Sequence, residues 1–263
     1  MDLKLKNKNV FVSASSKGIG KVVAKLFLEE DSNVVISSSN IKNLEKTASI
    51  FKEKYSEKIH FIKCDINKPD EIEAAIKYSE NQFGNIDILV NNCGGPAPGY
   101  FNNLTEANWE AGYNQVLMSA VRFTKLVLPN MQKNNWGRII NITSISVKQP
   151  IDNLLLSNTF RSGLTAFAKT LSNQISLHNI TVNNVAPGLT LTNRLDELAK
   201  LKAKQNNISK DEMLLKMASE IPLKRLAKPE EVASAVVFLA SEQGSYINGQ
   251  TIVVDGGLIK SSY

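Results

Sequence analysis

Short apolar runs alternate with longer amphipathic stretches along the whole of this 263-residue chain. The short runs are rich in β-branched residues and almost continuously apolar, as is typical of strands that a parallel sheet buries on both faces. The expected strands begin at Asn9, Asn33, Ile59, Ile86, Gly137, Ile180 and Gln250, and the helical patterns begin near Gly18, Asn43, Pro69, Glu106, Leu154 and Pro229. This alternation predicts an α/β fold: a doubly wound, Rossmann-type domain with a central parallel sheet and helices on both faces.

No internal repeat, proline-rich linker or low-complexity tract interrupts this order, so we expect one domain over residues 1–263. The exception is a charged helical stretch over about 192–222, between the sixth strand and the last helix. Ligands of open α/β sheets bind outside the carboxyl ends of the strands, so an insertion at such an end is a candidate substrate lid. Its apolar residues available to cover a substrate are Leu195, Leu198, Leu201 and Met213 to Leu215.

Composition narrows the functional classes. No run of 18 apolar residues occurs, so we expect no membrane partner, and the first residues lack the pattern of a signal peptide, so we expect a cytoplasmic protein. Two cysteines and two scattered histidines favour neither a disulfide framework nor a metal site. The net charge is +6, but the lysines are scattered and no nucleic-acid-binding module is present. The lysines therefore favour a solvated helical face, and the basic balance is also compatible with an anionic cofactor or substrate.

A glycine-containing turn follows the first expected strand, in the segment VSASSKGIG. Small residues form the turn, and Gly18 and Gly20 then begin a helix. Such a turn brings backbone N–H groups close to a pyrophosphate at the positive end of the helix dipole. After the first strand of a βαβ series, it predicts a dinucleotide site.

Several motifs in one order resemble the short-chain dehydrogenase/reductase family. Ser13 to Gly20 resembles its TGxxxGxG loop, NNCGG at 91–95 its NNAG motif, and NNVAPG at 183–188 its PG turn. INGQTIVVDGG and PLKRLAKPEEVASAVVFLAS resemble its C-terminal segments. The resemblance spans residues 5 to 257 and is closest to the branch of 3-oxoacyl-carrier-protein reductases. It implies an NAD(P)-dependent oxidoreductase that transfers hydride between nicotinamide and a small oxo or hydroxy substrate. It also implies a homo-oligomer, with a tetramer favoured.

The resemblance also implies which residues bind the cofactor. They are Ser13, Ser15, Ser16, Lys17, Gly18, Ile19, Gly20, Ser38, Ser39, Asp65, Ile66, Asn92, Gly94, Arg161, Pro187, Gly188, Thr190 and Thr192. NADP is favoured over NAD, which remains possible, because the second strand ends in serines without the carboxylate that NAD selection needs, and Lys17 is available to a 2′-phosphate. The family's first glycine is Ala14 here, and we expect the turn to accept it if its φ is negative.

The catalytic positions depart from the family. Ser144 matches the carbonyl-polarising serine, but the tyrosine thirteen residues later is Ser157 and the lysine four residues beyond is Arg161. The asparagine expected seven residues after Trp109 is Val116. Serine is a poor general acid, and the arginine proton is not available near neutral pH.

Three hypotheses follow from this altered site. The first is a working oxidoreductase in which Arg161, or Ser144 with Ser157, polarises the carbonyl while water or another donor, such as Tyr100, Tyr113 or Ser146, supplies the proton. The second is a non-catalytic NADP(H)-binding or sensing protein. The third is another reaction on the same scaffold.

Overall fold

The computed structural model describes residues 1–261 and contains a seven-stranded sheet in the order β3-β2-β1-β4-β5-β6-β7, with every pair parallel. The strands are β1 Asn9–Val12, β2 Asn33–Ser38, β3 Ile59–Lys63, β4 Ile88–Asn91, β5 Gly137–Ile142, β6 Ile180–Pro187 and β7 Thr251–Val254. The strand order reverses between β1 and β4, which confirms the predicted doubly wound architecture.

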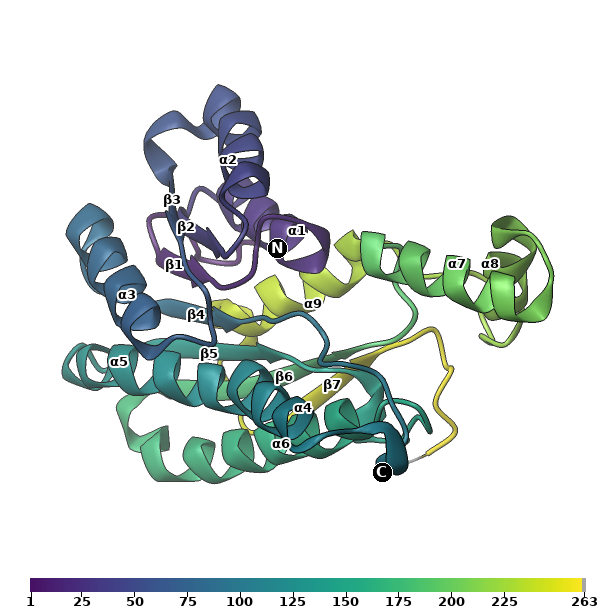
Figure 1. The fold of residues 1–263 in the computed structure, drawn as a ribbon. Coiled ribbons are helices and arrows are strands. Elements are labelled where there is room, and N and C mark those ends of the chain that lie inside the picture. Colours follow the sequence, from purple (N-terminus) through teal and green to yellow (C-terminus); the bar gives the residue numbers. More distant parts are fainter. Residues whose placement is uncertain (262–263) are drawn as a thin grey trace.

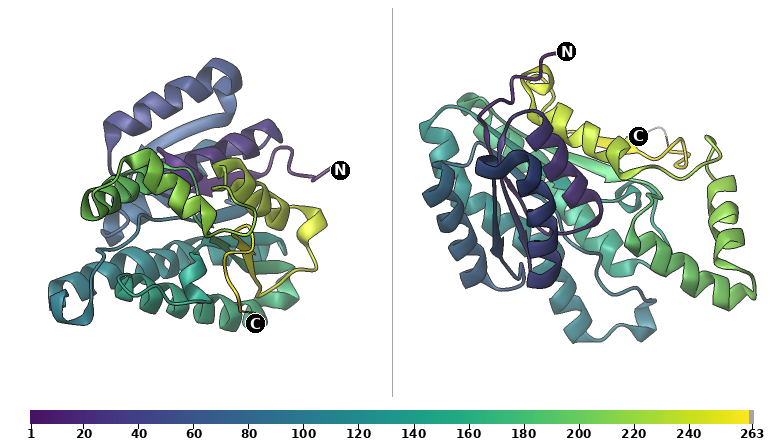
Figure 2. Two further views of the ribbon diagram at one scale, coloured as in Figure 1. Left: turned by 90° about the vertical axis from the view of Figure 1, so that its right-hand side faces the viewer. Right: turned by 90° about the horizontal axis from the view of Figure 1, so that it is seen from above.

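Helices cover both faces of this sheet (Figures 1 and 2). One layer holds α1 (Gly18–Glu29), α2 (Ile41–Tyr55) and α9 (Pro229–Ala240), and the other holds α3 (Pro69–Phe83), α5 (Ser119–Lys133) and α6 (Leu155–Ile175). The remaining helices are α4 (Glu106–Gly112), α7 (Asn193–Asn206) and α8 (Lys210–Ser219). The 3-10 turns are Ser56–Lys58, Phe101–Asn103, Ile145–Val147, Ser176–His178 and Glu242–Gly244.

Successive strand residues enter two different cores. In β1, Val10 and Val12 pack beneath α1 and α9, whereas Phe11 between them packs against Phe123 of α5 with ring centroids 5.2 Å apart. Each strand side chain points to the face opposite its neighbour's, so a strand covered on both faces must be apolar at every position. This requirement explains the uninterrupted apolar runs in the sequence.

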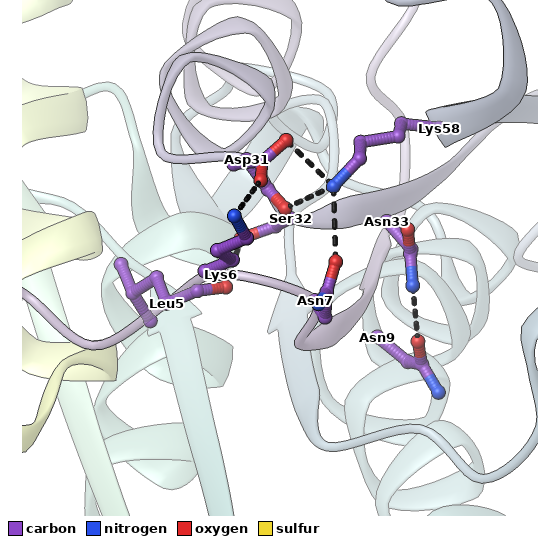
Figure 3. Close-up of polar contacts among 8 residues, drawn as sticks. All are labelled: Leu5, Lys6, Asn7, Asn9, Asp31, Ser32, Asn33 and Lys58. Atoms are coloured by element: carbon purple, nitrogen blue, oxygen red, sulfur yellow. Dashed lines mark hydrogen bonds and ion pairs between the residues drawn. The ribbon is translucent and has the colours of Figure 1, made fainter.

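A polar network lies at the amino ends of β1 and β2, at the end of the sheet opposite the site (Figure 3). Lys58 Nζ reaches Asp31 Oδ1 at 2.6 Å, the Asp31 carbonyl at 2.7 Å and Asn7 Oδ1 at 3.1 Å. Asn33 Nδ2 donates to Asn9 Oδ1 at 2.9 Å, between residues that also pair in the sheet register. The ammonium beside Asp31 lowers the pKa of that carboxyl. The network therefore sets the register of the first two strands.

The helical region from residue 106 to 133 is interrupted by a π-helix over Tyr113–Met118. Ser119 Oγ donates to the carbonyl of Gln115 at 2.6 Å, which supplies a side-chain bond within the widened turn. A π-turn holds one more residue than an α-turn and changes which side chains face the neighbouring elements.

Helices α7 and α8 form a hairpin that stands away from the sheet (green, at the right of Figure 1). It has its own small core of Leu195, Ala199, Ala203, Met213 and Met217. Leu195 and Met213 are therefore buried inside the hairpin, and the expectation that they are available to cover a substrate is wrong. Their burial is what holds two short helices together away from the main core.

The hairpin joins the body through a narrow backbone ladder. The N–H of Leu191 donates to the carbonyl of Ala227 at 2.8 Å, and the N–H of Ala227 donates to the carbonyl of Leu189 at 3.0 Å. The chain thus leaves the body and returns to it through two segments that are bonded side by side, residues 189–191 and residue 227. We call these two segments the neck of the hairpin.

Candidate active site

A ladder of buried asparagines lies directly beneath the carboxyl ends of the central strands. Asn91 Nδ2 donates to Asn141 Oδ1, and Asn141 Nδ2 donates to Asn184 Oδ1, both at 2.9 Å. Asn184 Nδ2 continues to Thr251 Oγ1 at 3.1 Å. Because these residues are direct partners in the β4–β5, β5–β6 and β6–β7 registers, the ladder aligns four neighbouring strands, and candidate site residues follow β4, β5 and β6.

The first strand passes into α1 through the predicted glycine turn. Gly18 has a φ of +60°, and a Cβ there would meet nothing closer than Thr192 at 3.7 Å, so the backbone is open on that side. Gly20 is the reverse case, because a Cβ would lie 2.6 Å from Asn92 Nδ2 and 2.8 Å from the Ala14 carbonyl. The first turn of α1 contains no acidic residue, and no side chain of the described residues caps it. Its free N–H groups fit an anion such as a pyrophosphate.

Ala14 adopts a left-handed backbone, with a φ of +46°. The expectation of a negative φ at this position is therefore wrong. The turn keeps the shape that a glycine would give it, and the alanine Cβ carries a conformational cost of about 1 kcal/mol. Asn92 Nδ2 donates to the Ala14 carbonyl at 2.9 Å and holds this conformation.

Two predicted cofactor residues of the turn have their hydroxyls engaged within the fold. Ser13 Oγ donates to the Asn92 carbonyl at 2.7 Å and accepts the Asn92 N–H at 2.8 Å. Ser15 Oγ donates to the Val12 carbonyl at 2.7 Å and accepts the N–H of Ser37 at 3.1 Å. Both serines are buried. They connect β1 to its two neighbouring strands and leave only backbone groups for a cofactor.

The end of β2 offers hydroxyl and cationic groups. Ser16 Oγ donates to Ser38 Oγ at 2.9 Å, and Ser38 Oγ accepts the Asn40 N–H at 3.2 Å. Lys17 and Ser39 are exposed beside them. Residues 37–40 contain no carboxylate, so this surface suits the 2′-phosphate of NADP better than two free ribose hydroxyls.

The remaining predicted cofactor residues lie on the turns that leave successive strands. Asp65 and Ile66 follow β3, and Asn92 and Gly94 follow β4. Pro187 ends β6, and Gly188 packs so tightly that a Cβ would lie 2.8 Å from Asp255. The turn continues to Thr190 and then to Thr192, which caps α7 by accepting the Leu195 N–H at 3.4 Å. Ile19 is the exception to this placement, because its side chain packs partly against the core.

Arg161 is buried, and each of its N–H groups has an acceptor within the protein. Nη1 donates to the carbonyls of Ile142 at 2.9 Å and Thr143 at 3.0 Å, at the end of β5. Nη2 makes two longer contacts, 3.7 Å to Cys93 Sγ and 3.5 Å to the Gly94 carbonyl. No ion pair involving Arg161 is formed within residues 1–261. The guanidinium thus joins the ends of β4 and β5, and its Nη2 edge is the less tightly held one.

Ser144 and Ser157 each accept one N–H from the protein. Arg161 Nε donates to Ser157 Oγ at 3.2 Å, and the N–H of Ser146 donates to Ser144 Oγ at 3.1 Å. Neither hydroxyl donates to another group within residues 1–261, so each O–H is free to donate to a ligand. Both bonds draw electron density from the serine oxygens and strengthen them as donors.

The side-chain hydroxyls of the other candidate proton donors form no hydrogen bond with Ser144 or Ser157 within residues 1–261. Tyr100 and Tyr113 are exposed, and Ser146 Oγ is buried without a hydrogen-bond partner among the described residues. The structure therefore assigns none of them as the donor.

Three side chains near the loop after β4 were not predicted from the sequence. Gln115 of the π-helix lies against Gly94, since a Cβ on that glycine would lie 3.1 Å from Gln115 Nε2. Arg194 of α7 donates through Nη1 to the Gly95 carbonyl at 3.4 Å. Phe160 packs with Trp109 at 5.8 Å between ring centroids. In the sequence, the only signals were the glycines that leave room for these side chains: Gly94 for Gln115, Gly95 for Arg194 and Gly112 for Phe160.

Comparisons with known proteins agree with this arrangement. The family model described as enoyl-(acyl carrier protein) reductase matches residues 13–259. NADPH-dependent reductase BacG of Bacillus subtilis is 34% identical over 98% of this chain and 100% of its own, and the 3-oxoacyl-[acyl-carrier-protein] reductase FabG of Aquifex aeolicus is 32% identical over the same shares. L-sorbose reductase from Gluconobacter frateurii, solved with NADPH and L-sorbose, superposes with a TM-score of 0.95 at 32% identity, covering 99% of this chain and 100% of that one.

Proposed function

This chain belongs to the short-chain dehydrogenase/reductase family, and we propose that it works through a site in which Ser144 is the family's serine while Ser157 and Arg161 replace its tyrosine and lysine. The chain is an NADP-dependent oxidoreductase that acts on a carbonyl or hydroxyl group. The reaction converts an oxo compound, NADPH and a proton to the alcohol and NADP⁺, or the reverse. The observation that carries the proposal is the pair of serine oxygens that each accept an N–H and keep a free O–H.

The residues present fit NADP. We propose that the open backbone at Gly18 and the uncapped start of α1 bind the pyrophosphate, and that Ser16, Lys17, Ser38 and Ser39 bind the 2′-phosphate. Asp65 and Ile66 would flank the adenine. Thr190, Thr192 and the backbone of Pro187 and Gly188 would hold the nicotinamide end. The long contacts of Arg161 Nη2 make this edge the part of the guanidinium that a ribose hydroxyl can engage.

Bound NADPH supplies the hydride that reduces the carbonyl carbon. As negative charge develops on the carbonyl oxygen, the hydroxyls of Ser144 and Ser157 donate to it. The buried charge of Arg161, held by the carbonyls of Ile142 and Thr143, strengthens Ser157 as a donor and adds electrostatic stabilisation. Since Thr143 directly precedes Ser144, Arg161 also fixes the two serines relative to each other.

Water completes the reaction. The guanidinium retains its proton at neutral pH, and serine is a much weaker acid than tyrosine, so neither acts as the family's tyrosine does. We propose that the alkoxide held by the two serines takes its proton from water, and that Gln115, whose amide lies against Gly94, helps to position that water.

The partners and location are also part of this proposal. We expect a homo-oligomer, with a tetramer favoured, in which α5, α6 and β7 supply the interfaces, and we expect the protein in the cytoplasm. None of the helices within residues 1–261 is long and apolar enough to cross a membrane. The α7–α8 hairpin is our candidate for the substrate lid.

Alanine variants of the two serines test the proposed site. Loss of one oxyanion donor typically lowers kcat by about 10²–10³-fold, so we expect Ser144→Ala and Ser157→Ala each to show such a loss while the Kd for NADPH stays within about twofold. Ser162→Ala, at an exposed position on the same helix, is the control. Unchanged kcat in both variants would refute the role of the hydroxyls. NADPH binding without turnover of any carbonyl by the wild type would favour the non-catalytic alternative.

A further inference from the structure

Three consecutive residues after β4 gather side chains from distant parts of the chain. The Gly94 carbonyl accepts from Arg161 at 3.5 Å, and the Gly95 carbonyl accepts from Arg194 at 3.4 Å. Pro96 is buried and lies near Gly112, where a Cβ would meet Pro96 at 3.5 Å and the Phe160 ring at 3.0 Å. One short loop thus contacts two guanidinium groups and lies near an aromatic cluster.

Arg194 has unused capacity to bind an anion. Its guanidinium makes a single long bond, to the Gly95 carbonyl, and forms no ion pair within residues 1–261. On its own helix, Asp196 is engaged by Lys200 and Lys210, each at 2.8 Å, and Glu197, three residues after Arg194, forms no ion pair with it in the described part of the chain. Its remaining N–H groups therefore have no acceptor among the described residues and lie open to a ligand.

Stability does not account for an arginine at this position. Arg194 lies in the first turn of α7, where the helix dipole disfavours a cation. It also shares a loop with the buried cation Arg161, which repels it. A planar guanidinium with free donors suits a carboxylate better than any other common anion except phosphate.

The cluster near Pro96 is aromatic. Phe160 contacts Trp109 and Tyr113, with ring centroids 5.8 Å and 6.0 Å away. Phe160 lies three residues after Ser157, so the two side chains project from neighbouring positions on one face of α6. A substrate held at Ser157 would meet this aromatic cluster along its length.

We propose that the substrate is an oxo acid or the corresponding hydroxy acid, whose carboxylate binds Arg194 while its apolar body packs toward Phe160. This inference rests on the proposed function, because it places the reacting carbonyl at Ser144 and Ser157. The pyrophosphate of the cofactor lies elsewhere in the proposed site, at Gly18, against which Thr192 packs. Arg194 is two residues further along and reaches the loop after β4 instead. It is a specificity residue, and the hairpin that carries it delivers it to the site.

A matched pair of probes tests the carboxylate. Benzoylformate and benzoylformamide share a carbon skeleton and differ in charge. Losing one charged hydrogen-bond partner corresponds to roughly 10–100-fold in binding, so we expect Arg194→Gln to lower kcat/KM for benzoylformate by about that factor. The same variant should leave benzoylformamide reduction and the Kd for NADPH nearly unchanged. Lys202→Gln removes an exposed cation elsewhere on α7 and is the control.

Binding without turnover separates this inference from the proposed function. Mandelate and mandelamide, titrated calorimetrically into the NADPH complex, cannot be oxidised by the reduced cofactor. We expect mandelate to bind more tightly than mandelamide, and Arg194→Gln to abolish the difference. That result would support the site even if the enzyme failed to reduce either ketone, a failure that would count against the proposed function alone. Equal binding of the two probes, or a variant that weakens NADPH instead, would overturn the inference.

Discussion

Arg161 changes the chemistry of its site through the shape of one functional group. A lysine ammonium has three donors at a single point, whereas the guanidinium spreads five donors over a plane. Here that plane reaches Ser157, the end of β5 and the loop after β4 together. The group therefore positions three pieces of backbone and polarises one hydroxyl, and it does not exchange a proton.

Ala14 offers a test of backbone strain at the cofactor turn. Its φ of +46° costs an alanine about 1 kcal/mol, so Ala14→Gly should raise the free energy of unfolding by up to about 1 kcal/mol after the extra entropy of glycine is counted. Urea denaturation measures this. Ala166→Gly, at an exposed position inside α6, should instead cost about 1 kcal/mol. Equal destabilisation by both substitutions would contradict the strained backbone.

The places of the candidate catalytic residues in the fold could be predicted from the sequence, but their interactions could not. Ser144, Ser157 and Arg161 were located because spacing along one helix and one strand end is preserved in the folded chain. The bond from Arg161 to Ser157 and the left-handed Ala14 depend on the orientation of side chains and peptides. Those orientations are set by residues distant in sequence, such as Asn92 for Ala14.

The elements differ in how far the sequence foretold them. The helix starts at Pro69, Glu106 and Pro229 could be predicted because acids in the first turn mark them locally, and the start at Gly18 could be predicted from the glycine turn. The π-helix over Tyr113–Met118 was not, since an inserted residue leaves the apolar pattern of a helix nearly unchanged. Counting by seven led to Val116, which is buried, while Gln115 faces the loop after β4.

The neck of the α7–α8 hairpin carries an ion pair with a clear dependence on pH. Arg225 binds Glu231 through two bonds of 2.7 Å, and the Lys228 N–H adds a third at 2.8 Å. Together these lower the pKa of Glu231 to about 2. The carboxylate's contribution is therefore complete above its ordinary pKa of about 4.5 and is lost as the pH falls toward about 2.

Glu231→Gln should lower the Tm at neutral pH. The difference in Tm between variant and wild type should disappear as the pH falls from about 4.5 toward about 2. Scanning calorimetry across the acid range measures it, with the exposed neighbour Glu230→Gln as the control. A gap that persists at the lowest pH would show that the ion pair does not tie the neck. Because both partners are exposed, high salt should also narrow the gap.

At the scale of the whole molecule, the sheet makes the site. The apolar runs of the sequence predicted all seven strands, and their alternation with helices predicted a parallel sheet. The asparagine ladder from Asn91 to Asn184 aligns β4, β5 and β6, and the candidate catalytic serines and the hairpin neck follow from these strands. The position of the hairpin away from the sheet could not be predicted. Its amphipathic pattern is compatible both with a lid over the site and with a hairpin that has its own core, and the structure shows the core.

Transfer of deuterium from the nicotinamide ring of deuterated NADPH to a carbonyl substrate tests most directly whether the serine–arginine site works as a reductase. Benzoylformate and benzoylformamide are incubated with wild-type protein and labelled cofactor, and mass spectrometry locates the label in the product. We predict label on the carbinol carbon with the wild type and a loss of about 10²-fold or more in the Ser144→Ala and Ser157→Ala variants. Binding of NADPH by the wild type with no label in either product, or in those of a wider panel of ketones, would contradict a working serine–arginine site.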